Sequence, residues 1–584
     1  MTTKIFTDRS RIVTADRCKR RRFLEYHQDG TGIVPTKMPL PLAVGIAVHA
    51  GLAVLLQEKQ EQITADATQA GYWSDVTIED HAVAAALREF AQFSQSLEVD
   101  TTESAAMQPT PAADVFQSQV VAQARELGMD EAAIAGLARD PAVARSEFDR
   151  YLQQEQAALV EGMVRAYARR RLRPLLEQFE VLEVEREGEW KLSEWEECVN
   201  CHKEFVAGEG LNDCHNCGYC DKDNGRISRE LWFMSRPDAL LRERQSNELY
   251  LLSYKTTATW DARKARDIEH DMQGLSEGVE VERRLGEWWR RLSEPTSYAV
   301  ALSFDIPTPV YKYLKSLAAP PRIHAIRYEF LLKGYRAEDK ELSARLGITA
   351  YTQHSHLVRQ YVATSVPKKG DGGYRVGDTC WSWEYFRVED DKDSKLSWQN
   401  WHSRPVFDRD PYVPMHGESV KEWIDALDAS ELLMSGEDST VGLQPRALGW
   451  KSPAQAMGVT KEHPLDEVFV PPVTVWRSED DLRDWVESIE HQEREVAQHV
   501  AEIDAMKRET SLDNPLDGQI RSSLNKYFPM NRSSCSYPSE CPYVKVCYAG
   551  AEMKADPLAV GAGMFKKRIA NHPVEEESWK NGAK

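Results

Sequence analysis

The sequence lacks features that several classes of protein require. No apolar run approaches the roughly 20 residues of a membrane span, and the start, MTTKIFTDRSRI, has no apolar signal-peptide core. We therefore expect a cytoplasmic protein without a membrane contact. There is also no G-x4-G-K-[ST] phosphate-binding loop, so ATP-driven translocation would have to come from a partner protein.

Positive charge is also scarce. The 584 residues include 93 Asp and Glu against 73 Lys and Arg, a formal net charge of −20. This argues against a protein that coats nucleic acid with its whole surface, because phosphate contacts depend on lysine and arginine. Local basic clusters remain, in KRRR, RAYARRRLR and KKR, and these either line a groove or are solvated helix faces. The length predicts several domains, or one domain with large insertions.

The ten cysteines are unevenly spread. Cys18 and Cys380 stand alone, five lie between Cys198 and Cys220, and three lie between Cys535 and Cys547. In a chain without a secretion signal, such clusters favour metal sites over disulfides.

The middle cluster, CVNCHKEFVAGEGLNDCHNCGYC, contains two C-x2-C pairs separated by 12 residues. Two such turns aim four thiolates at one ion, which predicts a zinc ribbon. We assign its Zn²⁺ ligands to Cys198, Cys201, Cys214 and Cys217, with Cys220 as the alternative for the last place. The ribbon is either a structural staple or a surface that contacts nucleic acid or a partner.

The last cluster, FPMNRSSCSYPSECPYVKVCYAG, supplies three thiolates at five-residue spacers. Three thiolates make an incomplete tetrahedron, and Cys18 in TADRCKRRRFLEY is the natural fourth ligand. Four thiolates suit either zinc or an iron–sulfur cluster, and spacing alone does not separate the two.

These features resemble the RecB-type branch of the PD-(D/E)XK nucleases. The resemblance rests on the N-terminal cysteine, the three C-terminal cysteines, and a strand–turn–strand, from RPDALL to LYLLSYKTT, that ends in a lysine. More narrowly, the chain is similar to the iron–sulfur members, which include CRISPR-adaptation exonucleases, the AddB subunit of recombination nucleases and phage-encoded exonucleases. In that group four cysteines hold a [4Fe–4S] cluster, which the resemblance assigns to Cys18, Cys535, Cys541 and Cys547.

The resemblance also implies an active site. His49 in PLAVGIAVHAGLAVLL matches the G-x-x-x-H helix of the family, in which the histidine lies at the metal site. Asp238 in SRPDALL matches the aspartate that binds Mg²⁺ or Mn²⁺. Lys255 in LLSYKTT matches the lysine that orients the attacking water and offsets negative charge in the transition state.

Ser253 departs from the family, which places Asp or Glu two residues before the lysine. A neutral hydroxyl is a poor substitute for a carboxylate at a Mg²⁺ site. Three explanations are open: another acid has taken over, the site works with His49, Asp238 and the Tyr254 carbonyl, or the protein binds without cutting. The replacement candidates are Glu183, Glu185, Glu187 and Glu230, and we expect Glu185 to be among the catalytic residues.

A second departure lies downstream, in DIEHDMQGLSEGVE. Gln273 matches the glutamine of the family's Q-x-x-x-Y helix, and we expect it to contact the nucleic acid backbone. Glu277 stands where the family has tyrosine, so the hold on the substrate differs there.

The remaining segments are interpreted as scaffold. Residues 60–160 show helical periodicity around a polar linker, and residues 320–410 suggest strands that continue the core sheet. The segment 476–506 predicts one long amphipathic helix with Ser478 as its N-cap.

We expect an α/β protein with a restriction-endonuclease-like mixed sheet flanked by helices, a helical insertion, a zinc-ribbon insertion and a C-terminal Fe–S clasp. The expected parts are N-terminal helices (1–58), a helical subdomain (59–160), the nuclease core (161–280) with the ribbon (197–222), a sheet extension (281–475), a long helix and clasp (476–550), and a tail (551–584). The expected function is metal-dependent cleavage of DNA, at ends or on single strands, with a helicase, recombination or replication partner. The alternatives are a catalytically silent DNA- or partner-binding protein of the same fold and a metal-stapled scaffold.

Overall fold

The structure is a computed structural model. It describes residues 2–36, 39–64, 75–98, 141–198, 214, 226–269, 271–293, 306–338, 343, 348–355, 357, 361–363, 376–380, 382–387, 401–406, 420–422, 424–425, 428, 464–509, 517–535, 541–549, 557–561, 563–570, 572 and 575–576.

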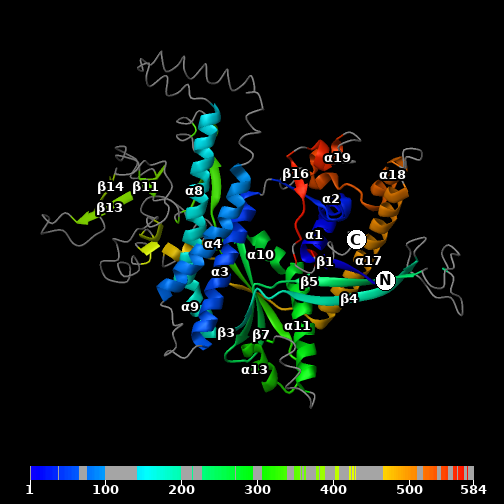
Figure 1. Cartoon of the computed structure of the whole chain (residues 1–584). Helices are drawn as coiled ribbons and strands as arrows, with labels where there is room; N and C mark the ends of the chain where they lie inside the picture. Colours follow the sequence, from blue (N-terminus) through cyan, green and yellow to red (C-terminus); the bar gives the residue numbers. More distant parts are fainter. Residues whose placement is uncertain are drawn as a thin grey trace.

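The protein has a mixed α/β fold in which several sheets are flanked by helices (Figure 1). The helices are α1 (Arg9–Arg17), α2 (Lys19–Tyr26), α3 (Leu40–Thr64), α4 (Asp75–Glu98), α8 (Pro141–Tyr167), α9 (Arg173–Gln178), α10 (Ala262–Glu269), α11 (Met272–Ser293), α13 (Thr308–Ser316), α17 (Glu479–Glu509), α18 (Asp517–Tyr527), α19 (Val544–Tyr548) and α21 (Pro557–Val560). The strands are β1 (Thr2–Asp8), β2 (Ile33–Pro35), β3 (Phe179–Val184), β4 (Gly188–Cys198), β5 (Arg226–Ser235), β6 (Ala239–Glu243), β7 (Leu249–Thr257), β8 (Ile323–Leu332), β9 (Tyr335–Glu338), β10 (Tyr351–His354), β11 (Tyr361–Ala363), β12 (Val376–Cys380), β13 (Ser382–Arg387), β14 (Trp401–Val406), β15 (Val473–Val475) and β16 (Phe565–Lys567).

The central sheet has five strands in the order β15-β8-β7-β6-β3. The predicted strand LYLLSYKTT is β7, and it forms the predicted antiparallel hairpin with β6. β7 and β8 run parallel, and the chain between them contains α11 and α13. Asp238 directly precedes β6, and Lys255 lies near the C-terminal end of β7, so the hairpin brings these two positions to the same end of the sheet.

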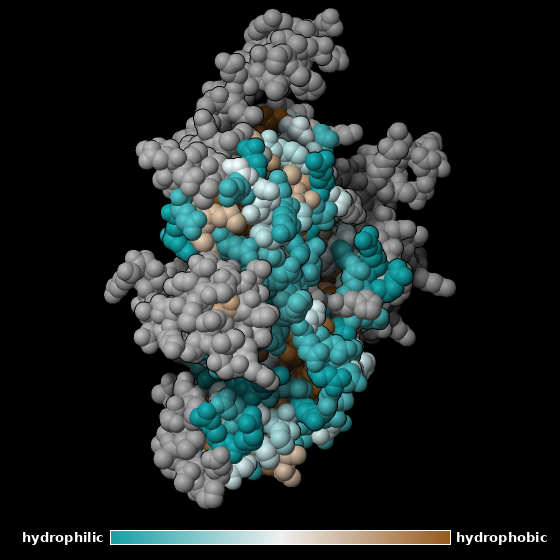
Figure 2. Space-filling view, turned by 90° about the vertical axis from the view of Figure 1, so that its right-hand side faces the viewer, coloured by the Kyte–Doolittle hydropathy of each residue, from teal (hydrophilic) through white to brown (hydrophobic). Residues whose placement is uncertain are grey.

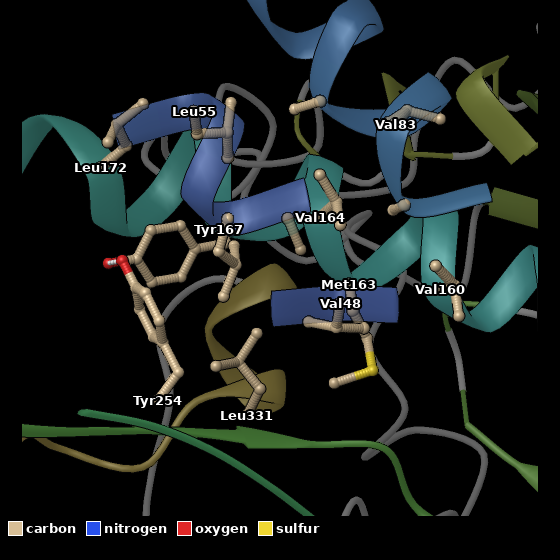
Figure 3. Packing of buried hydrophobic residues seen from close by; sticks show 14 of the residues in the cluster. Val48, Leu55, Val83, Val160, Met163, Val164, Tyr167, Leu172, Tyr254 and Leu331 are labelled. Carbon is tan, nitrogen blue, oxygen red and sulfur yellow. Dashed lines mark hydrogen bonds between the residues drawn. The ribbon is translucent and has the colours of Figure 1, made fainter. Parts of the chain in front are cut away.

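Helices cover both faces of this sheet. Side chains alternate along a strand, so neighbouring residues of β7 enter different cores. Leu252 and Tyr254 pack with α3, α4 and α8, as Figure 3 shows for Tyr254 beside Tyr167. Leu251 belongs to the core that contains residues of α11 and α13. Ser253 and Lys255 share the side of Leu251.

α3 corrects one expectation, because residues Leu40–Gln62 are long and apolar enough to cross a membrane. In the structure Val44, Val48 and Leu52 of this helix are fully buried and pack in the same core as α4, α8 and the sheet. The core helix of a soluble protein passes the same test of length and composition, so the finding is weak evidence either way.

A second sheet, β1-β5-β4, lies beside the first, and helices from both ends of the chain pack near it (Figure 1). The predicted helix at 476–506 is α17, and Ser478 caps it by accepting a hydrogen bond from the Asp481 amide at 3.1 Å. Glu493, which interrupts the apolar stripe of α17, is buried and pairs with Arg22 of α2 at 2.7 Å. β16 pairs with β2, so the C-terminal segment joins the N-terminal one.

The expectation for residues 320–410 is confirmed in part. β8 belongs to the core sheet, but β12 pairs with β11, and β13 pairs with β14 in a separate antiparallel hairpin. Local alternation indicates a strand but does not identify its partner, which is why the continuation of the core sheet was predicted wrongly.

The face turned toward the viewer in Figure 2 is mainly hydrophilic over its coloured part. Its apolar residues lie in small separate patches, partly recessed between polar ones. This agrees with the large share of charged residues in the sequence.

Candidate active site

His49 and Asp238 meet at one end of the central sheet. His49 lies on α3, and its Nδ1 is 3.1 Å from Oδ1 of Asp238. Pro237 lies between the end of β5 and this aspartate, where its missing N–H does not interrupt a ladder. The other carboxylate oxygen, Oδ2, accepts a hydrogen bond from the Tyr254 amide at 2.6 Å. Strand β7 therefore holds Asp238 through its backbone.

The electrostatic surroundings keep Asp238 ionised. Burial raises the pKa of its carboxyl, but the charge and hydrogen bond of His49, the Tyr254 amide and the charge of Lys255 outweigh burial and hold that pKa below its usual value. An ionised, partly buried carboxylate beside an imidazole is a donor set that a hard or borderline divalent cation accepts.

Glu185 is the acid that approaches this pair. It follows β3 with φ of 42°, in the left-handed region, and its amide donates to the Asp238 carbonyl at 3.0 Å. Burial raises the pKa of the Glu185 carboxyl, and the negative charge of Asp238 raises it further, while Arg236 and His49 lower it. A left-handed glutamate costs on the order of 1 kcal/mol, and such strain concentrates at functional sites.

The other three candidate acids are engaged elsewhere. Glu183 is buried and accepts hydrogen bonds from Arg284 at 2.9 Å. Glu187 lies 3.8 Å from Arg236 and is more exposed than Asp238. Glu230 lies on β5 and accepts a hydrogen bond from Trp232. Glu185 has both His49 and Asp238 in its electrostatic environment.

Lys255 lies on the other side of β7 from Tyr254 and interacts with an acid that the sequence did not single out. Its Nζ is 3.6 Å from Oδ2 of Asp271, and Asp271 also pairs with Arg9 at 3.1 Å. Burial lowers the pKa of Lys255 and Arg9 lowers it further, while Asp271, Glu277 and Asp238 act in the opposite direction. Asp271 therefore anchors the lysine.

Ser253 is completely buried, and its Oγ has no hydrogen-bond partner among the described residues. It pairs across the sheet with Tyr328 of β8, which packs in the core with α11 and is also fully buried. Position 253 therefore supplies a neutral hydroxyl and no carboxylate.

Gln273 is the second residue of α11, but its side chain lies outside the described part of the structure. Glu277, which stands where the family that the chain resembles has tyrosine, is buried on the same helix and lies in the electrostatic surroundings of Lys255. Its charge thus adds to that of Asp271.

The described residues contain no group of three or more His, Cys, Asp or Glu side chains arranged to hold a metal ion. At the candidate active site, His49 and Asp238 are in contact and Glu185 lies nearby without completing such a group. Mg²⁺ usually takes one or two carboxylates together with water and substrate phosphate. The donors present fit that requirement, and the substrate would supply the rest.

The structure describes two of the four cysteines assigned to the zinc ribbon. Cys198 ends β4, and it packs against Cys214, both of them buried. Cys201 and Cys217 lie outside the described residues. The ribbon therefore stays a prediction, with two of its four sulfur ligands adjacent.

The structure brings Cys18 to the C-terminal cysteines. The Asn531 amide donates to Cys18 Sγ at 3.5 Å, and Cys535 Sγ donates to the Asn531 carbonyl at 3.7 Å. The Cys541 amide donates to the Cys535 carbonyl at 2.8 Å. Burial raises the pKa of Cys547 to about 11; Arg20 lowers it, whereas Cys18, Cys541 and Cys535 raise it further.

These thiols are near one another but not arranged around a single ion. Four thiolates suit either a zinc ion or a four-iron cluster, and the described contacts do not separate the two. The six cysteines whose side chains the structure describes, including these four, are all free of disulfides.

Sequence reasoning missed Asp271, Arg9 and the Tyr254 amide. The amide belongs to the backbone and leaves no trace in residue type. Asp271 stands two residues before Gln273. The adjacent sequence does not indicate that Arg9 of α1, 262 positions away, also pairs with it.

Comparison with known proteins adds nothing to this geometry. No family model matches the chain, and no curated protein matches it. What the site does must therefore be inferred from its own residues.

Proposed function

We propose that the protein is a divalent-metal-dependent DNA nuclease with a RecB-like PD-(D/E)XK core, directed to DNA ends or single strands in replication, recombination or repair. One observation carries the proposal. Asp238 lies in contact with His49 and within the electrostatic reach of Lys255, at the end of the β6–β7 hairpin.

The order of elements supports the restriction-endonuclease-like core. Helix α3 precedes β3, β6 and β7, and α11 leads to β8, which pairs in parallel with β7. This arrangement directs the ends of β6 and β7 toward α3, where the histidine lies.

Each residue of the candidate site would have a separate role in cleavage. Asp238, Glu185 and His49 would hold a divalent ion, which when bound supplies Lewis-acid stabilisation of the phosphate. Lys255, anchored by Asp271, would orient the attacking water and offset charge that develops on the phosphate oxygens. Tyr254 fixes the orientation of Asp238 through its amide.

The two cysteine sites would act as structural supports. Cys18, Cys535, Cys541 and Cys547 would hold a [4Fe–4S] cluster that ties the two ends of the chain together. Cys198, Cys201, Cys214 and Cys217 would hold Zn²⁺ in a ribbon after β4.

A second candidate, a binding protein that does not cut, has one observation in its favour. Ser253 is buried at the position where the resembled family carries an acid. The described residues also contain no group of three His, Cys, Asp or Glu side chains that could hold a metal ion. Both candidates predict binding of DNA, so cleavage is the property that separates them.

The test uses protein purified without oxygen and end-labelled DNA in linear single-stranded, linear double-stranded and circular single-stranded forms, each with Mg²⁺, Mn²⁺ or EDTA. The proposal predicts metal-dependent loss of the linear substrates. Cleavage of the circle would indicate an endonuclease. Binding without cleavage of any form would favour the second candidate.

A further inference from the structure

Two lysines, Lys264 and Lys333, lie together beyond the C-terminal end of β7. Lys264 is on α10, and its Nζ donates to Thr257 Oγ1 at 2.9 Å. Lys333 follows β8; its amide donates to the Thr257 carbonyl at 2.9 Å and its Nζ to the Pro41 carbonyl at 2.8 Å. Both are tied to the strand that carries Lys255.

The two ammonium groups repel each other. Burial, and after it the positive charge of Lys264, lowers the pKa of Lys333 to about 8. Among the described residues neither lysine forms an ion pair, because their partners are hydroxyl and carbonyl oxygens.

The pair lies in a chain with an excess of acidic residues. The chain carries 93 acidic residues against 73 lysines and arginines, and nearby cations do have acidic partners, as Lys255 and Arg9 have Asp271. Holding two cations close together without an acid costs free energy that an anion from outside can recover.

The local structure keeps this arrangement in place. Oδ1 of Asp261 accepts the Lys264 amide at 2.9 Å at the start of α10, and the ring of Trp260 lies 4.2 Å from the ring of Phe330. The turn between β7 and α10 is thereby held against the core. Lys264 is only partly exposed and bends back over Thr257.

The position indicates what the anion is. Thr257 lies two residues beyond Lys255, about 7 Å along the strand. A phosphate bound by the two lysines would therefore belong to the same strand of nucleic acid as the phosphate at Asp238. Tyr335, two residues after Lys333, has an exposed fraction of 50%, which offers a surface on which a base can stack.

We infer that Lys264 and Lys333 form a second phosphate-binding subsite, which holds the DNA backbone next to the phosphate that is cut. The inference rests on the proposed function and adds to it a contact that neither the histidine nor the carboxylates make.

The test measures binding of a fluorescein-labelled single-stranded oligonucleotide over a range of salt concentrations, in EDTA to prevent cleavage. The variants are Lys264→Ala, Lys333→Ala and the double variant. The matched control is Lys566→Ala/Lys567→Ala, which removes the same charge from two exposed lysines of β16. Thermal unfolding of each variant checks that it is folded.

We expect the double variant to bind about tenfold more weakly. The slope of log K against log salt should fall by about 0.7, since the two lysines together neutralise one phosphate of a single strand. The β16 control should keep the slope of the parent. The Lys333→Arg variant, which keeps the positive charge, should also show the salt slope of the parent.

The outcomes separate failure of the second subsite from failure of the proposed nuclease function. Unchanged binding and slope in the double variant of a protein that binds and cleaves DNA would overturn the subsite and leave the proposed nuclease intact. If the variants fold poorly, the parent protein is tested instead with a series of oligonucleotides, each of which carries one neutral methylphosphonate at a different position. Equal binding of all these oligonucleotides would overturn the subsite. A parent that binds inorganic phosphate but no DNA would overturn both proposals.

Discussion

The Nδ1 of His49 lies 3.1 Å from Oδ1 of Asp238, although the two residues are 189 positions apart. The contact joins α3 to the residue before β6, and it brings together two residues that the family resemblance assigned to one metal site. Position 253 carries a serine where the family that the chain resembles has an acid, and Glu185 is the acid that we propose as its replacement.

Glu185→Gln should raise the Mg²⁺ concentration that gives half-maximal cleavage by about tenfold or more, because the charge of a second carboxylate is lost. Glu187→Gln is the matched control, since Glu187 faces Arg236 at 3.8 Å. A metal titration of the cleavage rate gives both values. Equal Mg²⁺ requirements for the two variants would show that Glu185 is not the second acid.

Ser253→Ala should change the free energy of unfolding by less than about 1 kcal/mol, because the Oγ makes no hydrogen bond among the described residues. Ser253→Asp should lower it by more than about 2 kcal/mol in EDTA, because it buries a carboxylate. Chemical denaturation measures both. An aspartate variant as stable as the alanine variant would contradict the burial of this position.

The cysteine assignments predict separate metal losses. Cys18→Ser should reduce iron and leave zinc unchanged, because Cys18 lies with the C-terminal cysteines. Cys198→Ser should do the reverse, because Cys198 packs against Cys214. Elemental analysis of protein purified without oxygen measures both metals, and each variant is the control for the other. Zinc at both sites would refute the iron–sulfur cluster.

DNA affinity should fall as pH rises through about 8, the value to which burial and the charge of Lys264 lower the pKa of Lys333. The sign follows from lysine chemistry, since the ammonium is charged below its pKa and neutral above it. Binding in EDTA at a series of pH values measures the effect. In Lys333→Arg this pH dependence should disappear, because arginine stays protonated; if it persisted, another group would be responsible.

The elements that the sequence predicted best are those with a local signal. β7 is an apolar run that ends in polar residues, and α17 has three- and four-residue apolar spacing after a capping serine. Both were predicted at nearly their observed bounds.

The features that were missed depend on distant parts of the chain. The pairing of β13 with β14 rather than with the core sheet is not encoded in their alternation. The anchoring of Lys255 requires Asp271, which Arg9 of a remote helix also contacts. The left-handed φ of Glu185 results from the β3–β6 junction and not from its residue type.

The most direct measurement is the single-turnover cleavage rate of end-labelled DNA by the parent, Asp238→Asn and Lys255→Ala, with Mg²⁺ and without oxygen. Asp480→Asn, an exposed acid of α17 that pairs with Arg483, is the control. We predict that the parent and the control cut the DNA, and that the other two variants are slower by at least about a hundredfold. Cleavage at the parental rate by both variants, or binding without cleavage by a folded parent with its metals, would contradict the account.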